Sequence, residues 1–340
     1  MRTIIIGFGT VGGAFAQILH EKRNELLETF GFRPTLVSVI DIKGAVVNPS
    51  GVNVDELRKS QCECGSIALH PDFEPGVGGV EVIERVDADV VVEATPSNIE
   101  TGEPGLSHIM AALRYKKHVI TTNKGALAIA FPALLELASY NKVSLRFSGT
   151  VGGGTPILDF GRKCLAGSRI LSIKGILNGT TNYVLSRMDE CGLSMDAALK
   201  EAQQKGYAET DPSYDLMGID SASKLVIMAN WLMGKSVTIR DVDVSGITEV
   251  SIDEVQEAKN KDCAVKLIAY LDDKTMWVKP QLIPRRHPLC VGGVLNAVSF
   301  RTEYAHEVTI VGRGAGGIET GEAILRDLIE IRRSAYNSTR

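Results

Sequence analysis

An α/β fold, in which a parallel-sheet domain is followed by a second α+β domain, is predicted from three features of the sequence. The chain has 340 residues with 44% hydrophobic and 23% charged side chains, which is typical of a globular protein of about two domains. Short apolar strands alternate with amphipathic helices over residues 1–148. A glycine motif follows the first strand directly and opens the first helix. This combination predicts a Rossmann-type parallel sheet at the N-terminus.

Strands and helices alternate regularly in the predicted first domain, residues 1–148. We expect strands at 3–6, 36–40, 90–92, 118–121 and 143–147, and helices at 11–27, 106–115 and 132–138. Residues 44–80 interrupt this order and predict a loop-rich insertion with a short helix at 54–59. Strands separated by helices pair in parallel, and ligands bind such sheets at the carboxyl ends of the strands.

The second predicted domain covers residues 149–300 and opens with a glycine-rich stretch, 149–156. We expect its strands at 170–177 and 277–282, and helices at 156–166, 180–190, 194–205, 220–233 and 253–272. Residues 301–340 hold a strand at 307–311 and a helix at 320–332, and we expect them to complete the first domain.

The glycine motif at the start of the chain predicts a dinucleotide site. Its three glycines permit a tight turn, the approach of a pyrophosphate, and close packing of helix on strand, in that order. The helix N-terminus then faces the phosphates. The predicted cofactor contacts in this segment are Gly7, Phe8, Gly9, Thr10, Val11 and Gly12.

The sequence leaves the choice between NAD and NADP open. Asp41 ends the second strand, where a carboxylate commonly accepts the ribose hydroxyls of NAD. Lys43 lies two residues further on and is suited to a 2′-phosphate, and Arg58 and Lys59 add positive charge from the insertion. The alternative is that Asp41 and Lys43 form only a polar strand end.

The segment 206–224 packs four acidic residues into a loop and then enters a helix. Asp220 and Lys224 are four residues apart and share a helix face. A solvated ion pair there is worth about 0.3–0.5 kcal/mol. The functional alternative is a site whose carboxylates bind an ammonium group beside a catalytic lysine. Burial, or a second cation such as Lys124, lowers the pKa of a lysine towards neutrality.

Composition argues against several other classes of protein. The net charge of −4 disfavours a nucleic-acid partner, which usually needs a clustered basic face. Six scattered cysteines, of which only Cys62 and Cys64 lie close together, favour reduced thiols over a zinc site. A core strand begins at residue 3, and no apolar run approaches the length of a membrane span, so we expect a cytoplasmic protein.

Several motifs in this order resemble those of homoserine dehydrogenases, and the resemblance covers nearly the whole chain. Besides the first glycine motif, the markers are the segments 122–124, 150–156, 178–183, 206–224 and 314–317. The resemblance implies NAD(P)-dependent interconversion of L-homoserine and L-aspartate 4-semialdehyde in the synthesis of threonine, methionine and isoleucine. It also implies a homodimer built through the second domain.

The resemblance assigns roles to individual residues. Lys224 is implied as the general acid and base, with Lys124 beside it. Homoserine is implied to contact Glu209, Asp215, Asp220, Gly179 and Thr180, while Thr95 and Gly316 line the cofactor. These residue types suit the chemistry, because reducing an aldehyde needs a hydride from the cofactor and a proton for the developing alkoxide.

The chain departs from the family pattern at two points. Family members commonly bind sodium through a glutamate and backbone carbonyls, but Ser148 occupies the glutamate position. The carbonyl donors Val151, Gly153 and Thr155 are kept, so a weakened sodium site is expected. The chain also ends near the 320–332 helix, so we expect no threonine-sensing regulatory domain.

Two other functions compete with this interpretation. Aspartate-semialdehyde dehydrogenase chemistry needs a cysteine nucleophile beside a histidine, and Cys164 and Cys191 have no evident partner. A nucleotide-sensing module without catalysis gives no reason for the acidic residues and Lys224 to occur together.

Overall fold

The computed structural model describes residues 1–337 and divides into two compact units. Unit 1 combines Met1–Thr150 with Gly316–Arg340, and unit 2 is Val151–Ala315. The chain therefore returns to unit 1 at Gly316 rather than at residue 301. The reason is that residues 307–313 pair with 295–301 in the sheet of unit 2. Over the described residues, every helix is too short or too polar to span a membrane.

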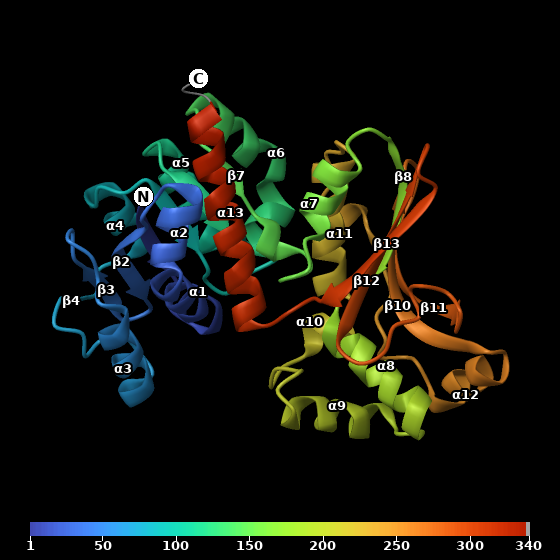
Figure 1. Ribbon diagram of the computed structural model, residues 1–340. Coiled ribbons are helices and arrows are strands. Elements are labelled where there is room, and N and C mark those ends of the chain that lie inside the picture. The colour runs from blue at the N-terminus through green and yellow to red at the C-terminus, as the bar shows by residue number, and fades with distance from the viewer. Residues whose placement is uncertain (338–340) are drawn as a thin grey trace. The chain divides into compact units, whose positions relative to one another are not determined.

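Unit 1 is built on a sheet of seven strands among the described residues, in the order β4-β3-β2-β1-β5-β6-β7 (Figure 1). The strands are β1 (Arg2–Ile6), β2 (Thr35–Asp41), β3 (Gly44–Val47), β4 (Phe73–Pro75), β5 (Val90–Glu93), β6 (His118–Thr121) and β7 (Leu145–Arg146). The five predicted strands pair in parallel. The insertion contributes β3 and β4, which extend the edge antiparallel because Ala45 and Val46 bury fully there.

The helices of unit 1 cover its sheet and carry its core. They are α1 (Thr10–Glu21), α2 (Arg23–Phe30), α3 (Val54–Cys64), α4 (Gly79–Arg85), α5 (Gly105–Arg114), α6 (Lys124–Tyr140) and α13 (Gly317–Asn337). The single helix expected over 11–27 breaks at Lys22 into α1 and α2. The last helix, α13, packs along α1, and Phe15, Ile324 and Leu328 join one apolar core (Figure 1).

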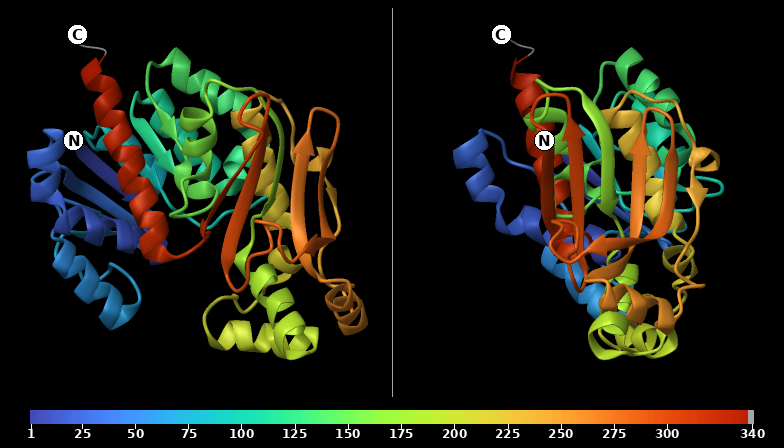
Figure 2. Two further views of the ribbon diagram at one scale, coloured as in Figure 1. Left: turned by 45° about the vertical axis from the view of Figure 1, so that its right-hand side comes forward. Right: turned by 90° about the vertical axis from the view of Figure 1, so that its right-hand side faces the viewer.

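Unit 2 is a mixed sheet of six strands among the described residues, in the order β13-β12-β8-β10-β11-β9. The strands are β8 (Ile170–Ile176), β9 (Asp243–Val244), β10 (Cys263–Asp272), β11 (Met276–Pro284), β12 (Leu295–Thr302) and β13 (Glu307–Arg313). Its helices are α7 (Ile157–Asp159), α8 (Gly179–Cys191), α9 (Met195–Gln204), α10 (Ser213–Leu216), α11 (Ile219–Leu232) and α12 (Ile252–Asn260). In the right panel of Figure 2, α11 lies behind the orange strands of this sheet, and the yellow-green helices α8 and α9 lie below them.

The expected helix over 253–272 is wrong. The chain forms α12, turns at Asp262 with φ of +54°, and continues as β10 in the middle of the sheet. Residues on both faces of β10 are buried from Ala264 to Ala269, so seven of its residues form an almost continuous buried run that only Tyr270 interrupts. A strand buried on both faces loses the polar–apolar alternation that distinguishes it from a buried helix. Strand β12, likewise buried, was not expected at all.

Candidate active site

The turn after β1 is shaped by two glycines that tolerate no side chain. Gly7 has φ of +95°, and a Cβ there would lie 2.6 Å from the Ala94 carbonyl oxygen. A Cβ on Gly12 would lie 2.0 Å from the Gly7 carbonyl oxygen. Helix α1 can therefore begin immediately beside the strand only because both positions are glycine.

Gly9 differs from these two glycines because it faces open space. A Cβ there would have no atom within 4 Å, and the N-terminus of α1 carries no side-chain cap. A cavity of ≈ 290 Å³ adjoins it, lined by Phe8, Gly9, Thr10, Gly13, Ala14, Gln17, Arg58, Gln61 and Cys62. Open backbone N–H groups at a helix N-terminus suit a pyrophosphate, so these residues fit a dinucleotide.

The carboxylate of Asp41 accepts its hydrogen bonds from other groups of the protein. Its Oδ1 accepts from the backbone N–H of Lys43 at 2.7 Å and of Gly44 at 3.2 Å. Its Oδ2 accepts from the Ser66 hydroxyl at 2.6 Å and the Ile67 N–H at 2.9 Å. A carboxylate has about four acceptor positions, so these donors use them all. Of the three basic residues first considered, Lys43 and Lys59 lie exposed, and it is Arg58 that lines the cavity.

Thr95 is held at the carboxyl end of β5 by a buried carboxylate. Glu93 is fully buried and accepts from both the N–H and the hydroxyl of Thr95. It also accepts from the Thr121 hydroxyl at 3.1 Å, at the end of the neighbouring strand β6. Asn123 donates to the Pro96 carbonyl at 3.2 Å and caps α6. This network fixes the loop that carries Thr95 against the start of α6.

Lys124 is the first residue of α6 and is half-buried. Its backbone N–H donates to the Ser97 hydroxyl at 2.9 Å, so the lysine sits at the same strand ends as Thr95. Gly316 reaches the glycine motif through its neighbour, because a Cβ on Gly317 would lie 2.7 Å from Thr10 Cγ2. The structure thus gathers Thr95, Lys124 and Gly316 at the carboxyl edge of the unit 1 sheet.

Lys224 lies in a buried cluster of unit 2 and is 7% exposed. Its Nζ donates to Asp220 Oδ2 at 2.7 Å and to the Leu177 carbonyl oxygen at 2.6 Å. Both residues of the ion pair are on α11, and Leu177 follows β8. The solvated ion pair considered above is therefore wrong, because both side chains are about nine-tenths buried.

Asn178 joins the two acidic residues of this cluster. Its Nδ2 donates to Asp215 Oδ1 at 2.7 Å and to Asp220 Oδ2 at 2.9 Å. Burial and the charge of Asp220 raise the pKa of Asp215. Asn178 was not among the predicted site residues, and its only signal in the sequence is its position immediately before Gly179 and Thr180.

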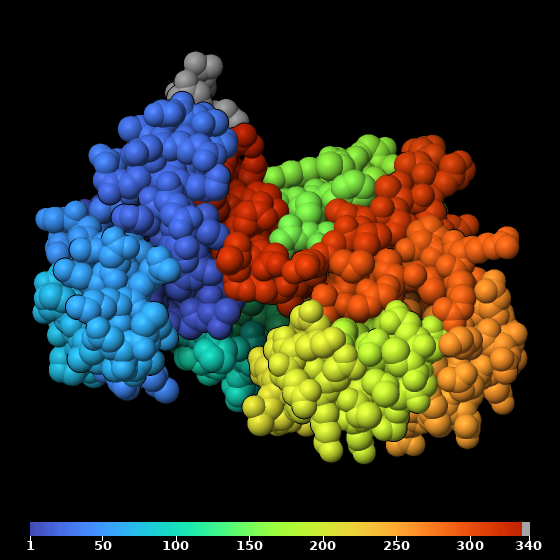
Figure 3. Space-filling model, turned by 60° about the horizontal axis from the view of Figure 1, so that its bottom comes forward, coloured from blue at the N-terminus to red at the C-terminus, as the bar shows by residue number. Residues whose placement is uncertain are grey.

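The remaining predicted substrate residues flank this cluster. The Thr180 hydroxyl donates to the Tyr207 carbonyl at 2.9 Å, and Gln203 Nε2 donates to the Glu209 carbonyl at 3.2 Å. Glu209 itself is exposed on the loop after α9, drawn yellow in Figure 3. Gly179 admits close packing, because a Cβ there would lie 3.0 Å from the Val294 carbonyl oxygen.

A second cluster anchors α9 and this loop to α8. The Glu201 carboxylate binds Tyr183 at 2.8 Å, Arg187 at 3.0 Å and Lys205 at 2.8 Å. Hydrogen bonding, first from Lys205, lowers the pKa of Glu201 to about 2. The loop that carries Glu209 therefore begins from a fixed helix end.

Ser148, which stands where the resemblance led us to expect a glutamate, binds the carboxylate of Asp327. The Ser148 N–H and hydroxyl donate to the Asp327 carboxylate at 2.9 Å and 2.7 Å. In unit 2, Gly152 and Gly153 take left-handed conformations, and Thr155 Oγ1 donates to the Arg313 carbonyl at 2.9 Å. Of the three carbonyls predicted to bind a cation, that of Thr155 accepts from the Ile157 N–H at 2.8 Å. Among the described residues, no three His, Cys, Asp or Glu side chains gather as for a metal.

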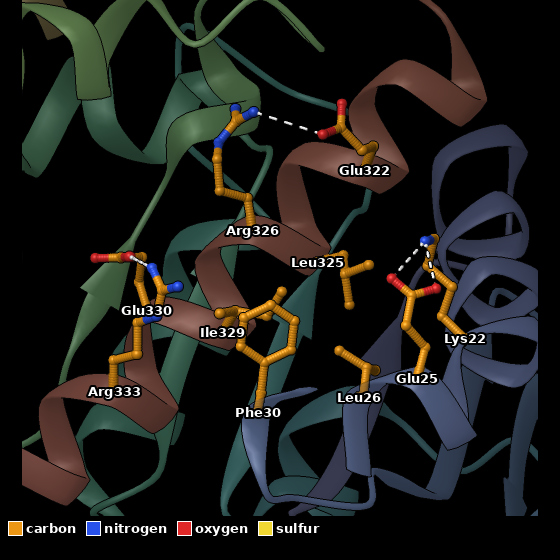
Figure 4. Close-up of a pocket in the computed structure, with 10 residues that line it drawn as sticks. All are labelled: Lys22, Glu25, Leu26, Phe30, Glu322, Leu325, Arg326, Ile329, Glu330 and Arg333. Atoms are coloured by element: carbon orange, nitrogen blue, oxygen red, sulfur yellow. Dashed lines mark hydrogen bonds and ion pairs between the residues drawn. The ribbon is translucent and has the colours of Figure 1, made fainter. Parts of the chain in front are cut away.

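A second cavity, of ≈ 300 Å³, lies between α2 and α13 (Figure 4). Each basic side chain that lines it is ion-paired with an acidic neighbour: Lys22 with Glu25, Arg326 with Glu322, and Arg333 with Glu330. The centre is apolar, with Leu26, Phe30, Leu325 and Ile329. None of the residues predicted for cofactor or substrate lines this groove.

Two family models match the chain and together cover most of it. The model described as homoserine dehydrogenase matches residues 156–329, and that of the homoserine dehydrogenase NAD-binding domain matches residues 7–148. Their boundary falls close to the boundary between units 1 and 2.

Full-length relatives and solved structures agree with these matches. A homoserine dehydrogenase of Methanocaldococcus jannaschii is 44% identical, over all of both chains. An NAD(+)-dependent homoserine dehydrogenase of Pseudomonas canavaninivorans is 38% identical, over 97% of this chain and 96% of its own. The structure of a hyperthermophilic archaeal homoserine dehydrogenase in complex with NADPH has a TM-score of 0.86 and 30% identity, covering 98% of each chain.

Proposed function

Because the chain belongs to the homoserine dehydrogenase family, we propose that Lys224 exchanges a proton with the C4 oxygen of the substrate. The chain is an NAD(P)-dependent oxidoreductase that interconverts L-homoserine and L-aspartate 4-semialdehyde. The assignment of Lys224 as the proton donor rests on its hydrogen bonds. The buried Lys224 ammonium donates one hydrogen bond to Asp220 and one to the Leu177 carbonyl. Its third N–H is therefore available to donate to a ligand.

In the direction of reduction, the substrate carbonyl carbon gains a hydride and its oxygen gains a proton. The bound nicotinamide supplies the hydride. Lys224 supplies the proton as negative charge develops on the oxygen, a contribution of typically 10²–10⁴-fold. In the reverse direction neutral Lys224 takes the proton back. The hydrogen bond to Asp220 at 2.7 Å holds the nitrogen in place during both transfers.

The amino group of the substrate needs an anionic partner. We assign this role to Asp215 and Asp220, which face one another across Asn178. Gly179, Thr180 and Glu209 are assigned to substrate contact because they border this cluster on α8 and the loop after α9. In unit 1, Lys124, Thr95 and Gly316 are assigned to the nicotinamide half of the cofactor.

The cofactor is NAD or NADP, and we propose that NADPH is preferred. Asp41 has no acceptor position left for a ribose hydroxyl, because four protein donors fill its carboxylate. Arg58 lines the cavity beside Gly9 and offers a planar fork of donors suited to a 2′-phosphate. A relative named as NAD(+)-dependent makes the comparison of both cofactors necessary.

We propose that the open face of the unit 2 sheet forms a homodimer. Tyr270 and Trp277 stack across β10 and β11 with ring centroids 5.1 Å apart, and Lys174 pairs with Tyr270 on the same face. All three side chains are half-exposed. Half-exposed stacked aromatic rings are typical of the centre of a protein interface. A Trp277→Glu variant should elute as a monomer in size-exclusion chromatography with light scattering.

Two further assignments are proposals. A monovalent cation would rest on the carbonyls of Val151, Gly153 and Thr155, and assays in sodium against choline chloride at equal ionic strength test this. We place the enzyme in the cytoplasm, as is usual for amino-acid biosynthesis, and cell fractionation tests it.

The decisive experiment measures homoserine-dependent reduction of NADP and NAD by absorbance, with the wild type and Lys224→Ala. We expect the variant to lose at least about 100-fold in kcat while its Kd for NADPH stays within about threefold. Lys200→Ala on the exposed side of α9 is the control and should match the wild type. Near-normal turnover by Lys224→Ala would refute the proton-transfer role.

A further inference from the structure

Asn178 occupies the centre of the acid–lysine cluster and is 5% exposed. Its amide has two separate tasks. The oxygen accepts from the Thr181 N–H at 2.9 Å and so caps α8. The nitrogen donates one hydrogen bond to Asp215 and the other to Asp220. Only this orientation of the amide is satisfied, because the reverse would turn a carbonyl oxygen towards two carboxylates.

The position of Lys224 follows from the same segment. Asp220 Oδ2 accepts both from Asn178 at 2.9 Å and from Lys224 at 2.7 Å. The second acceptor of Lys224 is the carbonyl of Leu177, the residue before Asn178. The lysine nitrogen thus has two acceptors. One is the carbonyl of residue 177 itself, and the other is the Asp220 carboxylate, which residue 178 holds in place.

We propose that Asn178 is a positioning residue that holds Asp215 and Asp220 side by side and thereby aims Lys224 at the substrate. The inference rests on the proposed role of Lys224. Two carboxylates in a buried space repel each other, and a neutral amide that donates to both lets them stay close without adding charge. Loss of the amide hydrogens leaves the repulsion between Asp215 and Asp220 uncompensated, so that Asp220 shifts together with Lys224, which is bonded to it.

Three substitutions separate the two tasks of the amide. Asp and Ser are N-caps about as good as Asn, so Asn178→Asp and Asn178→Ser keep the cap of α8. Both remove the donors to the acidic residues, and Asp adds a third carboxylate. Asn178→Ala removes cap and donors together. If Asn178 serves only as a cap, activity falls in the Ala variant alone.

We expect the Asp variant to be the least active, with kcat lowered by about 100-fold, and the Ser variant to lose about 10-fold. The KM for homoserine should rise in both, while the Kd for NADPH stays within about threefold. The acid limb of the pH profile of kcat/KM should move to higher pH, because the Asn178 hydrogen bond lowers the pKa of Asp215. The melting temperature of Asn178→Ser should stay close to the wild type, while that of Asn178→Asp should fall because a third carboxylate is buried beside Asp215 and Asp220.

Controls keep the result decisive. Ser194 caps α9 outside the cluster, so Ser194→Asp reports what a cap substitution alone does. If Asn178→Asp folds poorly, Asn178→Ser decides, because it keeps the cap of α8 and removes the donors to Asp215 and Asp220 without adding a carboxylate.

The outcomes distinguish the two proposals. Wild-type activity in Asn178→Asp and Asn178→Ser, with a loss in Asn178→Ala alone, overturns the positioning role. Absence of homoserine turnover in the wild type overturns the proposed function instead.

Discussion

The cofactor edge of unit 1 and the acid–lysine cluster of unit 2 solve the problem of binding charged ligands in opposite ways. The edge of unit 1 is made of backbone: Gly7 and Gly12 bring strand and helix together, and Gly9 leaves an open approach. The cluster of unit 2 is made of buried side chains that carry charge, Asp215, Asp220 and Lys224.

This difference predicts opposite sensitivities. A site built from backbone N–H groups carries partial charges that do not titrate, so it should respond to added volume and not to pH. A site built from buried ionisable groups should respond to lost charge and to pH even when shape is kept. The expected effects below test this contrast, beginning with the largest.

Added volume should damage unit 1 most. In Gly12→Ala the methyl group would lie 2.0 Å from the Gly7 carbonyl oxygen, so the turn must open. We expect the Kd for NADPH to rise by more than about 100-fold, equivalent to about 2.8 kcal/mol, and the melting temperature to fall. Gly9→Ala should weaken NADPH binding at an unchanged melting temperature. Isothermal titration and thermal melting measure both, and equal behaviour of the two variants would contradict the geometry.

Lost charge at constant shape should damage unit 2 next. Asp220→Asn leaves Lys224 buried without its ionic partner, which costs about 3–5 kcal/mol for typical buried pairs. We expect kcat/KM for homoserine to fall by about 10–100-fold, with the Kd for NADPH unchanged. Asp189→Asn breaks another ion pair of unit 2, that with Arg285, and serves as the control. If both variants lose activity equally, the effect is one of stability.

Arg58 tests whether one part of the cofactor edge does depend on a side-chain charge. We expect Arg58→Ala to lower kcat/KM with NADPH by about 10-fold and to leave NADH unchanged, because only NADPH carries the 2′-phosphate. Lys59→Ala is the matched control, since that side chain is exposed and faces Glu63. An equal loss with both cofactors would show that Arg58 does not read the phosphate.

A pH titration should give the smallest effect. Burial and the nearby Asp220 charge raise the pKa of Asp215 above its usual 3.8. The ionised form that binds ammonium is therefore lost at a higher pH than for an ordinary aspartate. We expect the KM for homoserine to rise as the pH falls, and to do so at a higher pH than an aspartate of ordinary pKa would allow. The Kd for NADH, which carries no titrating 2′-phosphate, should stay constant over the same range. A parallel change in both constants would remove the contrast between the two units.

The local patterns of the chain were sufficient for the parallel strands of unit 1 and for the glycine turn. Each depends on residues adjacent in sequence: β-branched runs for the strands, and Gly7, Gly9 and Gly12 for the turn. The motif 206–224 and its resemblance to homoserine dehydrogenases identified Lys224 and the acidic residues, and the family matches confirm that assignment of family. The roles of single residues stay predictions.

Other features depend on contacts between distant segments. The sequence of β10 predicts a helix, because burial on both faces removes the alternation of polar and apolar residues. It forms a strand because it pairs between β8 and β11. The position of Asp41 in the sequence predicts an acceptor for ribose hydroxyls. In the folded chain, Ser66 and Ile67 donate hydrogen bonds to this carboxylate instead. Asn178 caps α8, and only the folding of α10 and α11 brings Asp215 and Asp220 to its amide.

The sequence by itself thus determined the type of chemistry, because glycines, acidic residues and lysine reveal what they can bind wherever they occur in a motif. The tertiary structure decided which of these groups are available. Hydrogen-bond donors and acceptors are satisfied by whatever the fold brings near, and Asp41 and Asp220 acquired their different partners from segments far away in the chain.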